Sequence, residues 1–349
     1  MRSTAMPEAS DWPDESLDRK PTVTLRKWLT FLRVHTSNLT QVGAMLGPLL
    51  AGVRDIPLLI LFAIWGFCYH AWGFSDNNIQ DYNYDKTDPA KQHFALIKGT
   101  IPIPKAKLVN ILFFLPTLGI GLFLGYSNPA SIALLLLTIT AGMLYNRTCK
   151  KSLFAPIYIT IAFTSVPLFT FFSVAQNWNL QIIVVSLYTM FLMLFQIAFE
   201  GYLKDLQSDP VNLLRSMGAY VKKVSVYFGD TLYLGRQKAF WITVKFANLL
   251  VGIVYFFLIS TPDKTAIALY LLLGVGMAVI YDRLTNEHYD NKKVTSNAAR
   301  MEILTYFALI LMLQDALGWG IVLVLLVYPI LWFMTLNRLT WKTFLRPRV

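Results

Sequence analysis

Long apolar stretches constrain this chain more than any other feature of its sequence. Residues 106–126 and 239–260 are two examples, and each has the roughly 20 residues that a helix needs to cross about 30 Å of hydrocarbon. Lipid offers no hydrogen bonds to the backbone, so such segments must be helices. The chain is 55% hydrophobic and only 15% charged, which is too apolar for a water-soluble domain of this length. The sequence therefore predicts an all-α integral membrane protein.

The chain divides into ten apolar segments that are joined by polar loops. We predict a bundle of nine to ten transmembrane helices, because residues 301–336 form either two spans or one long broken helix with an interfacial piece. The segments cover residues 37–53, 57–75, 106–126, 129–145, 153–173, 180–200, 239–260, 265–281, 301–316 and 320–336.

Basic residues alternate between the loops. Lys and Arg gather before segment one, after segments two, four, six and eight, and at the end of the chain, whereas the other loops contain at most one each. The positive-inside rule then predicts a cytosolic position for both termini and for the loops after segments two and six. We expect residues 1–25 to form a disordered cytosolic tail, residues 26–338 the transmembrane helical domain, and residues 339–349 a basic C-terminal tail.

Charge, cysteine and histidine patterns exclude several classes of function. The net charge of +11 resides in loops between spans rather than on one soluble face, so nucleic acid is not a predicted partner. The two cysteines, Cys68 and Cys149, lie in unrelated segments and indicate no disulfide framework. The four histidines lack metal-binding spacing, which argues against a zinc hydrolase.

Two acidic motifs follow apolar segments two and six. Asn77, Asp81 and Asp85 are spaced four residues apart, so on a helix each is rotated only roughly 40° from the one before it. Asp205 and Asp209 repeat this spacing. Carboxylate oxygens arranged in this way suit Mg²⁺, which shares its coordination shell with water and phosphate oxygens. A single acidic motif beside lysines would indicate surface ion pairs worth about 0–1 kcal/mol, but the repeated pattern favours a metal site.

These residues resemble the UbiA superfamily of intramembrane prenyltransferases. The resemblance rests on the pattern N-x3-D-x3-D from Asn77, on Lys204-Asp205 with Asp209, and on the order of the two motifs, and it covers about residues 30–310. Residues 144–146 with Lys150, and residues 96–101, also match. The resemblance implies a helical bundle with a lipid-accessible central cavity, in which two magnesium ions hold the diphosphate of an isoprenoid donor.

The resemblance also implies roles for individual residues. The catalytic and metal-binding residues would be Asn77, Asp81, Asp85, Asp205 and Asp209, with Mg²⁺ as the cofactor. Further substrate contacts would come from Lys91, Tyr145, Lys150 and Lys204, although for the lysines a purely topological role is almost as well supported.

The chain departs from the family pattern at two places. Asn78 stands where the family commonly has a further Asp, which puts the metal occupancy in doubt. The sequence His93-Phe94-Ala95-Leu96 replaces a frequent Arg-Pro-Leu and removes a usual arginine from the loop. The acceptor therefore cannot be copied from the better known branches of the family.

Polar residues inside the spans are the candidates for acceptor contacts, because a polar group in lipid is costly unless it is paired or hydrated. Glu200 lies about one turn before the second motif and could act as a metal ligand, as a base that orients the acceptor, or as an ion-pair partner of Lys204 at i+4. Asn38 and Gln41 near the start of segment one are the other predicted contacts, and Gln196, Lys245 and Asn248 also qualify.

The predicted function is magnesium-dependent transfer of an isoprenyl group from a prenyl diphosphate to a lipophilic, aromatic acceptor through an allylic carbocation. The alternative is a membrane terpene cyclase, in which the carbocation attacks its own double bonds without an acceptor. A third interpretation is a secondary transporter, whose carboxylates would couple ions. The third is less well supported, because transporter sites lie near the bilayer midplane, whereas these motifs lie at helix ends. Prenyl diphosphate, membrane lipid and an optional lipophilic acceptor are the expected partners.

Overall fold

The computed structural model describes residues 24–88, 91–207, 209–225, 229–258, 263–285 and 288–341. Most of the predicted tails, residues 1–23 and 342–349, lie outside the described residues. The helices are α1 (Leu25–Phe31), the short turn η1 (Val34–Thr36), α2 (Ser37–Leu50), α3 (Ile56–Gln80), α4 (Tyr82–Asp85), α5 (Ile103–Gly125), α6 (Pro129–Thr148), α7 (Ala155–Phe172), α8 (Leu180–Phe195), the π-helix η3 (Gln196–Gly201), α9 (Tyr202–Lys204), α10 (Leu213–Ser216), α11 (Gln237–Leu258), α12 (Lys264–Leu284), α13 (Asn291–Met312) and α14 (Gln314–Trp341).

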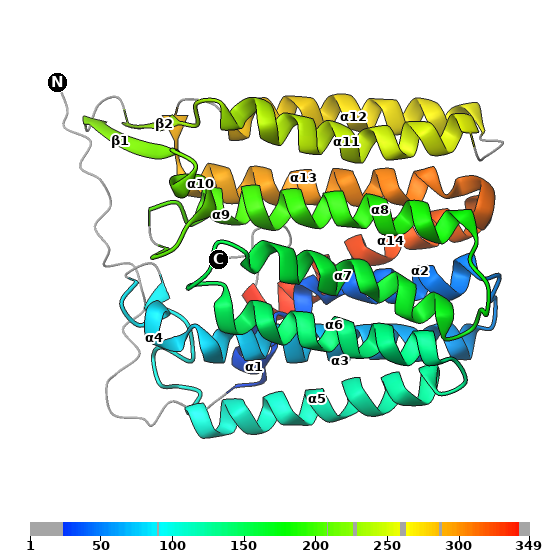
Figure 1. Cartoon of the computed structure of the whole chain (residues 1–349). Coiled ribbons are helices and arrows are strands. Elements are labelled where there is room, and N and C mark those ends of the chain that lie inside the picture. Colours follow the sequence, from blue (N-terminus) through cyan, green and yellow to red (C-terminus); the bar gives the residue numbers. More distant parts are fainter. Residues whose placement is uncertain are drawn as a thin grey trace.

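The long helices lie side by side in one bundle (Figure 1). Among the described residues, eight helices are long and apolar enough to cross a membrane, namely α3, α5, α6, α7, α8 with its continuation to Lys204, α11, α12 and α14. The predicted helical membrane bundle is thereby confirmed. The count of nine to ten spans is not, because α2 has only 14 residues and α13 begins with the polar sequence Asn-Lys-Lys.

The ambiguous segment 301–336 is divided between two helices. α13 ends at Met312 and α14 begins at Gln314, and the two pack against each other. The Tyr306 hydroxyl on α13 donates to the Leu325 carbonyl on α14 at 2.8 Å. Gly318 breaks the helical backbone of α14 with φ +76°, a conformation that glycine adopts without steric cost.

A small antiparallel sheet lies at the end of the bundle that carries α4 and α10 (Figure 1). Its strands are β1 (Tyr220–Ser225), β2 (Gly229–Tyr233) and β3 (His288–Tyr289), in that order. Val221 pairs with Leu232, and the rings of Tyr220 and Tyr233 stack at 4.7 Å. The sequence analysis treated these residues as loops, because strands this short carry a weak pattern.

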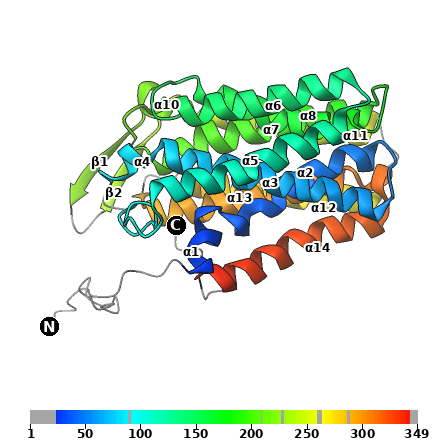
Figure 2. The same ribbon diagram turned by 90° about the horizontal axis from the view of Figure 1, so that it is seen from below.

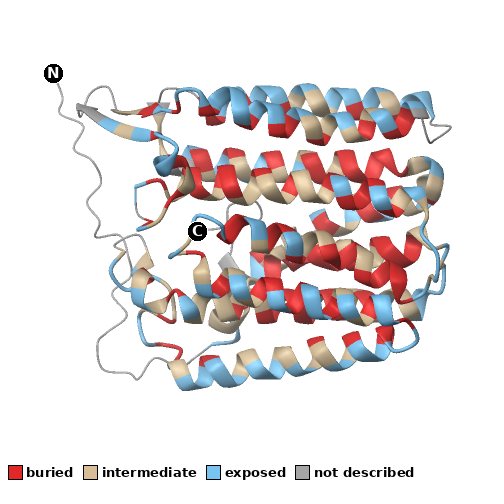
Figure 3. Cartoon of the chain, in the orientation of Figure 1, coloured by how far each residue is buried: buried red, intermediate tan, exposed pale blue. Residues whose placement is uncertain are grey.

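Buried and exposed side chains are distributed as a membrane protein requires. Buried residues lie between the helices, whereas the outer faces of α5 and α12 are exposed (Figure 3). Those outer faces are apolar: Leu112 on α5 and Leu272 on α12 are more than half exposed. Exposed leucines in such number would be unfavourable in water, so these faces are the lipid-facing surface of the bundle.

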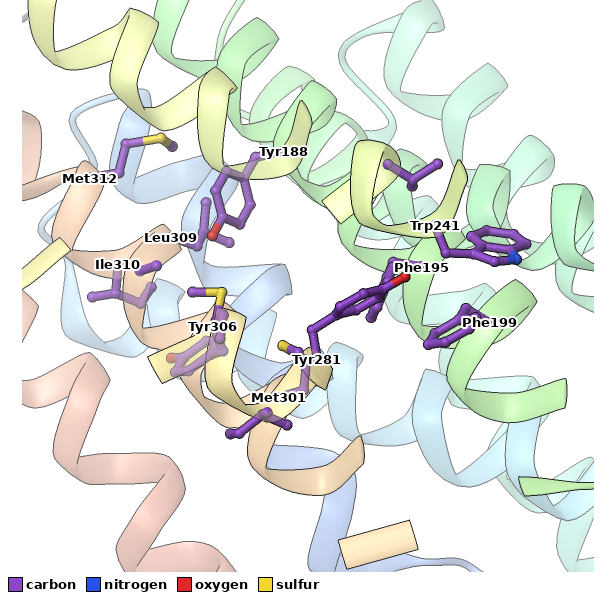
Figure 4. Packing of buried hydrophobic residues seen from close by; sticks show 14 of the residues in the cluster. Tyr188, Phe195, Phe199, Trp241, Tyr281, Met301, Tyr306, Leu309, Ile310 and Met312 are labelled. Carbon is purple, nitrogen blue, oxygen red and sulfur yellow. The ribbon is translucent and has the colours of Figure 1, made fainter. Parts of the chain in front are cut away.

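An aromatic cluster holds the end of α8 in place (Figure 4). Phe195 and Phe199 pack against Trp241 of α11 and Tyr281 of α12, and the rings of Phe199 and Trp241 are 5.6 Å apart. The second acidic motif follows this cluster directly in the chain, so the packing of α8, α11 and α12 fixes where that motif emerges.

The N-terminal segment is held by α14 on the far side of the bundle. Seen from below, the end of α14 lies beside α1 (Figure 2). The Trp332 indole donates to the Val34 carbonyl at 2.9 Å, and the Asn78 amide of α3 donates to the Phe31 carbonyl at 2.8 Å. The residues between α1 and α2 are thereby placed next to the first acidic motif.

Candidate active site

The two acidic motifs meet in one cavity of about 420 Å³ at the end of the bundle. Its walls come from α3, α4, α6, α7 and the segment from η3 to Asp209. All five predicted metal-binding residues line it, namely Asn77, Asp81, Asp85, Asp205 and Asp209. Residues at least 120 positions apart in the sequence thus line one cavity.

The first motif keeps its helical row although α3 ends at Gln80. The Asp81 N–H donates to the Asn77 carbonyl at 2.9 Å, and the Asp85 N–H donates to the Asp81 carbonyl at 2.9 Å. These four-residue hydrogen bonds place the three side chains one above another. The Asn77 amide then donates to Asp81 Oδ2 at 2.7 Å, so the carboxylate is oriented before any ligand binds.

The second motif lies in a turn after α9. The Asp209 N–H donates to the Asp205 carbonyl at 3.0 Å, which again stacks the two carboxylates. The turn is fixed from behind by Arg215, which donates to the Asp209 carbonyl at 2.7 Å, and by Asn212, which donates to the Tyr202 carbonyl at 2.8 Å. Ser208 lies outside the described residues.

Three predicted lysines balance these carboxylates. Lys91 Nζ lies 2.7 Å from Asp85 Oδ1, and Lys150 forms an ion pair with Asp209. Lys204 lines the same cavity. Because Lys91 and Lys150 bind carboxylates at the cavity wall, they are also positioned to bind a diphosphate once those carboxylates take other partners.

Arg33, one of the basic residues that precede the first apolar segment, is a further cation at this site. Its guanidinium carbon lies 4.9 Å from the centre of the Phe74 ring, and Nη2 donates to Asn78 Oδ1 at 3.4 Å. Its backbone is left-handed, with φ 48° and ψ 39°, which is strained for a residue with a side chain and is a feature of functional sites. Arg33 supplies positive charge in a site whose loop lacks the usual arginine.

The two departures from the family pattern have a structural consequence. Asn78 turns away from the acidic row: its amide donates to the Phe31 carbonyl and its oxygen accepts from Arg33. An aspartate could not donate to that carbonyl. Phe94, in the altered loop, contributes an aromatic wall to the cavity.

Burial changes the protonation behaviour of the carboxylates. Burial raises the pKa of the Asp81 carboxyl above its ordinary value, with Lys150 opposing and Asp85 adding to the shift. Burial also raises the pKa of Asp209, and the neighbouring Asp205 adds to it. Burial lowers the pKa of Lys150, but Asp209 more than offsets this, so that the net shift is upward. Uncompensated negative charge is therefore unfavourable in this site, and bound cations would stabilise the ionised carboxylates.

The donor set fits magnesium bound together with a diphosphate. No group of three His, Cys, Asp or Glu side chains in the described part of the chain is close enough to hold a metal alone. The acidic rows offer oxygen donors on both sides of the cavity. Mg²⁺ is commonly held by one or two carboxylates together with water and phosphate oxygens, so this arrangement suits an ion that arrives with its substrate.

A second cavity of about 450 Å³ adjoins the first and extends into the bundle. The two share the walls formed by Arg33, His70, Phe74, Phe163 and Lys204. Beyond these residues the second cavity is mainly apolar, with walls that include Gly43, Leu46, Val166, Leu192, Met193 and Leu309. A polar site thus opens directly into a hydrocarbon-like chamber.

The other predicted contacts divide into two groups. Tyr145 lines the first cavity and Glu200 the second. Asn38 instead donates to the Pro329 carbonyl at 2.9 Å, and Gln41 donates to Ser37 Oγ at 2.9 Å and accepts from the Tyr328 hydroxyl at 2.5 Å. Neither Asn38 nor Gln41 is among the residues that line the two cavities. Their bonds hold α2 to α14, so we do not include them among the substrate contacts proposed below.

The fold and the site define a multi-pass membrane protein with an acidic, lysine-balanced cavity that opens into an apolar one. A model of the UbiA prenyltransferase family matches residues 42–304, which is most of the chain. The chain belongs to this family and is accordingly an enzyme of the prenyl-transferring class.

Individual relatives agree with this assignment. The digeranylgeranylglyceryl phosphate synthase of Saccharolobus solfataricus is 25% identical over 201 residues, which are 56% of this chain and 68% of the relative. Among solved structures, a UbiA homologue from Aeropyrum pernix matches with a TM-score of 0.60 at 14% identity, over 80% of this chain and 98% of the other. A UbiA homologue from Archaeoglobus fulgidus, bound to GPP and Mg²⁺, matches with a TM-score of 0.53 at 16% identity, over 81% and 99%. At these identities, the structural likeness establishes the fold alone.

Proposed function

We propose that this protein transfers an isoprenyl group from a prenyl diphosphate to a lipophilic acceptor, with magnesium as cofactor. The observation that carries the proposal is the junction of two cavities: one is lined by both acidic motifs and three lysines, and the other is apolar. A prenyl diphosphate has the same division, with a highly charged head and a hydrocarbon tail. The Archaeoglobus homologue, which binds GPP and Mg²⁺, supports this ligand class.

The diphosphate is bound at the acidic cavity. Asn77, Asp81 and Asp85 on one side, and Asp205 and Asp209 on the other, would hold Mg²⁺ against its oxygens. When bound, Mg²⁺ neutralises the charge that develops on the diphosphate as the allylic C–O bond breaks. Lys91, Lys150, Lys204 and Arg33 add fixed positive charge to the leaving group, which lowers the barrier to ionisation because it is in place beforehand.

The carbocation needs a dry pocket with electron-rich faces. Tyr69, Trp72, Phe74, Tyr145 and Phe163 line the first cavity, and the rings of Tyr69 and Trp72 lie 5.8 Å apart. Aromatic faces attract cations, so this wall stabilises the allylic cation until a nucleophile reaches it. With both motifs on the predicted cytosolic side, a soluble donor would reach the site from the cytosol and a lipid-soluble partner from the bilayer.

Release of diphosphate tests the proposal. Purified protein in detergent or nanodiscs is incubated with Mg²⁺ and geranyl or geranylgeranyl diphosphate, and free diphosphate is measured. We expect magnesium-dependent release that Asp81→Ala or Asp205→Ala abolishes. Unchanged release in both variants contradicts the metal site, and hydrocarbon or terpene alcohol formed without any acceptor would favour the terpene cyclase instead.

A further inference from the structure

The apolar cavity contains a carboxylate with one oxygen that has no hydrogen-bond partner among the described residues. Glu200 lies in the membrane-spanning segment that ends at Lys204, lines the second cavity and is only 3% exposed. Its Oε1 atom has no hydrogen-bond partner. In the described part of the chain no ion pair joins Glu200 to Lys204, although the two are four residues apart. A buried carboxylate without a partner is costly, and inside a membrane such a residue marks a functional site.

Two further polar groups lie beside Glu200 on the same cavity wall. Glu302 of α13 lines the cavity and is close enough to Glu200 to repel its charge. The Gln196 side chain faces the Glu302 carboxylate, and the Gln196 Oε1 atom also lacks a partner. The cluster therefore presents unsatisfied acceptor oxygens to an apolar chamber. A ligand that brings O–H or N–H donors would satisfy them.

The helix that contains Glu200 is locally wider than an α-helix. Gln196–Gly201 form a π-helix between α8 and α9, and α13 packs against it. A single π-helical turn inside an α-helix is rare and is frequently found at functional sites. Here it brings Gln196 and Glu200 to the cavity while the chain continues to Lys204 and the second acidic motif.

The buried Lys245 attracts Glu200 electrostatically and compensates part of the charge of the cluster. Lys245 of α11 is 4% exposed, and its Nζ atom donates to Thr305 Oγ1 and lies 5.1 Å from the centre of the Phe195 ring. Among the described residues no ion pair joins Lys245 to Glu200, so the carboxylate is left available to a ligand. When Glu200 and Glu302 are ionised, this part of the cavity is negative and disfavours an anionic headgroup.

We propose that Glu200, Glu302 and Gln196 form the acceptor site, that the acceptor is a neutral lipid with a hydroxyl group, and that Glu200 takes the proton of that hydroxyl. This inference rests on the proposed prenyl transfer and specifies its acceptor. The site lies where the two cavities join, since Gly201 and Lys204 line both. A hydroxyl bound to Glu200 is therefore next to the allylic carbon that the diphosphate leaves.

The step balances in atoms and charge. The C–O bond between the allylic carbon and the diphosphate breaks, and the electron pair leaves with the diphosphate. A lone pair of the acceptor oxygen forms the new C–O bond, and the hydroxyl proton passes to Glu200 Oε1. The products are a prenyl ether, diphosphate and a protonated Glu200, which returns its proton to water.

The test measures two products in the same reaction. Wild-type protein, Glu200→Gln and Glu302→Gln are incubated with Mg²⁺, geranylgeranyl diphosphate and one of three probes: a monoalkylglycerol, a para-alkylphenol, or the monoalkylglycerol phosphate. Free diphosphate reports ionisation, and prenylated probe reports transfer. Asp315→Asn is the control, because it also replaces a carboxylate by an amide. Asp315 lies on α14, and its carboxylate accepts a hydrogen bond from the Tyr255 hydroxyl of α11.

We expect the wild type to prenylate the alkylglycerol or the phenol, and to prenylate the phosphate at least about tenfold less. In Glu200→Gln, the ratio of prenylated product to released diphosphate should fall by about 100-fold, which is the scale of a lost general base. The rate of diphosphate release should stay within about threefold of the wild-type rate, because ionisation does not use this base. Gln keeps the volume of the side chain and removes a buried charge, so the variant is expected to fold. Asp315→Asn should match the wild type in both readouts.

Other outcomes overturn the inference. A preference for the phosphate probe contradicts the neutral acceptor, and an unchanged ratio of transfer to release in Glu200→Gln contradicts the proton acceptor. Diphosphate release that yields only terpene hydrocarbons, with every probe untouched, contradicts the acceptor site itself. Absence of diphosphate release in the wild type would instead overturn the proposed function, so the two failures are distinguishable.

Discussion

Lys150, which follows α6, forms an ion pair with Asp209, which follows α9, across 59 residues of sequence. Both side chains are about nine-tenths buried, and the pair joins the two sides of the acidic cavity. Lys150 thus compensates Asp209 before substrate arrives, and it lies within reach of a diphosphate that Asp209 would help to bind through a metal.

Replacing Lys150 should therefore slow ionisation. In Lys150→Met the leaving diphosphate loses one preplaced positive charge, and we expect the rate of diphosphate release to fall by about 100-fold, the scale of one lost electrostatic contact in a transition state. Lys151→Met is the matched control, because the neighbouring Lys151 is exposed. Equal rates in the two variants would show that Lys150 serves only to balance Asp209.

Acidic pH should weaken magnesium binding earlier than ordinary aspartates would suggest. Burial raises the pKa of both Asp81 and Asp209, and a metal binds the ionised carboxylate in competition with protons. As the pH falls, these carboxylates are protonated above the usual range near pH 3.9, so the Mg²⁺ concentration for half-maximal diphosphate release should rise. The measurement is a magnesium titration at several pH values, and a constant half-maximal concentration down to about pH 4 contradicts the shifts.

A control variant separates this effect from general acid sensitivity. Asp55 caps the start of α3 at the other end of that helix, where its side chain accepts from the Leu58 N–H at 2.8 Å. Asp55→Asn preserves the cap, since Asn is an equally good N-cap residue, and should leave the magnesium titration unchanged. Asp81→Asn and Asp209→Asn should each weaken magnesium binding at neutral pH.

Arg33 should contribute to donor binding. Its guanidinium lies over Phe74, donates to Asn78 and lines both cavities. Arg33→Gln removes this charge, and we expect the KM for the prenyl diphosphate to rise by about tenfold, which corresponds to about 1.4 kcal/mol. Arg26→Gln removes an exposed charge from the adjacent α1 and should have no such effect. A KM for Arg33→Gln equal to that of the wild type would assign Arg33 to structure alone.

Sequence patterns predicted the features of this protein that depend on neighbours in the chain. The apolar segments are helices, and a backbone hydrogen bond spans four residues within each acidic motif, from Asp85 to Asp81 and from Asp209 to Asp205. The features that were missed depend on distant contacts. Arg33 reaches the site because Asn78 holds the preceding turn, and no local pattern reports this.

Asn38 and Gln41 also show that a sequence pattern does not identify distant contacts. The cost of a polar group in lipid predicted that each needs a partner, which is true, but the partners are Pro329 and Tyr328, which are 291 and 287 residues away. A periodic pattern cannot distinguish a protein partner from a substrate. The same argument applied to Glu200 has the opposite outcome, because there the structure leaves one carboxylate oxygen without a partner.

The width of the apolar cavity should determine the length of the donor. Gly43 lines this cavity, and an added Cβ would meet only Val166, at 3.9 Å, so a larger side chain would project into the open chamber. We expect Gly43→Leu to reduce activity with geranylgeranyl diphosphate at least about tenfold more than it reduces activity with geranyl diphosphate. Only the longer tail needs the volume that the leucine side chain would fill. Gly119→Leu makes the same change on the exposed face of α5, where an added Cβ meets nothing, and should leave both activities unchanged. Competing the two donors against each other in one reaction measures the ratio directly. An equal loss with both donors would place the prenyl tail elsewhere and leave the second cavity to the acceptor alone.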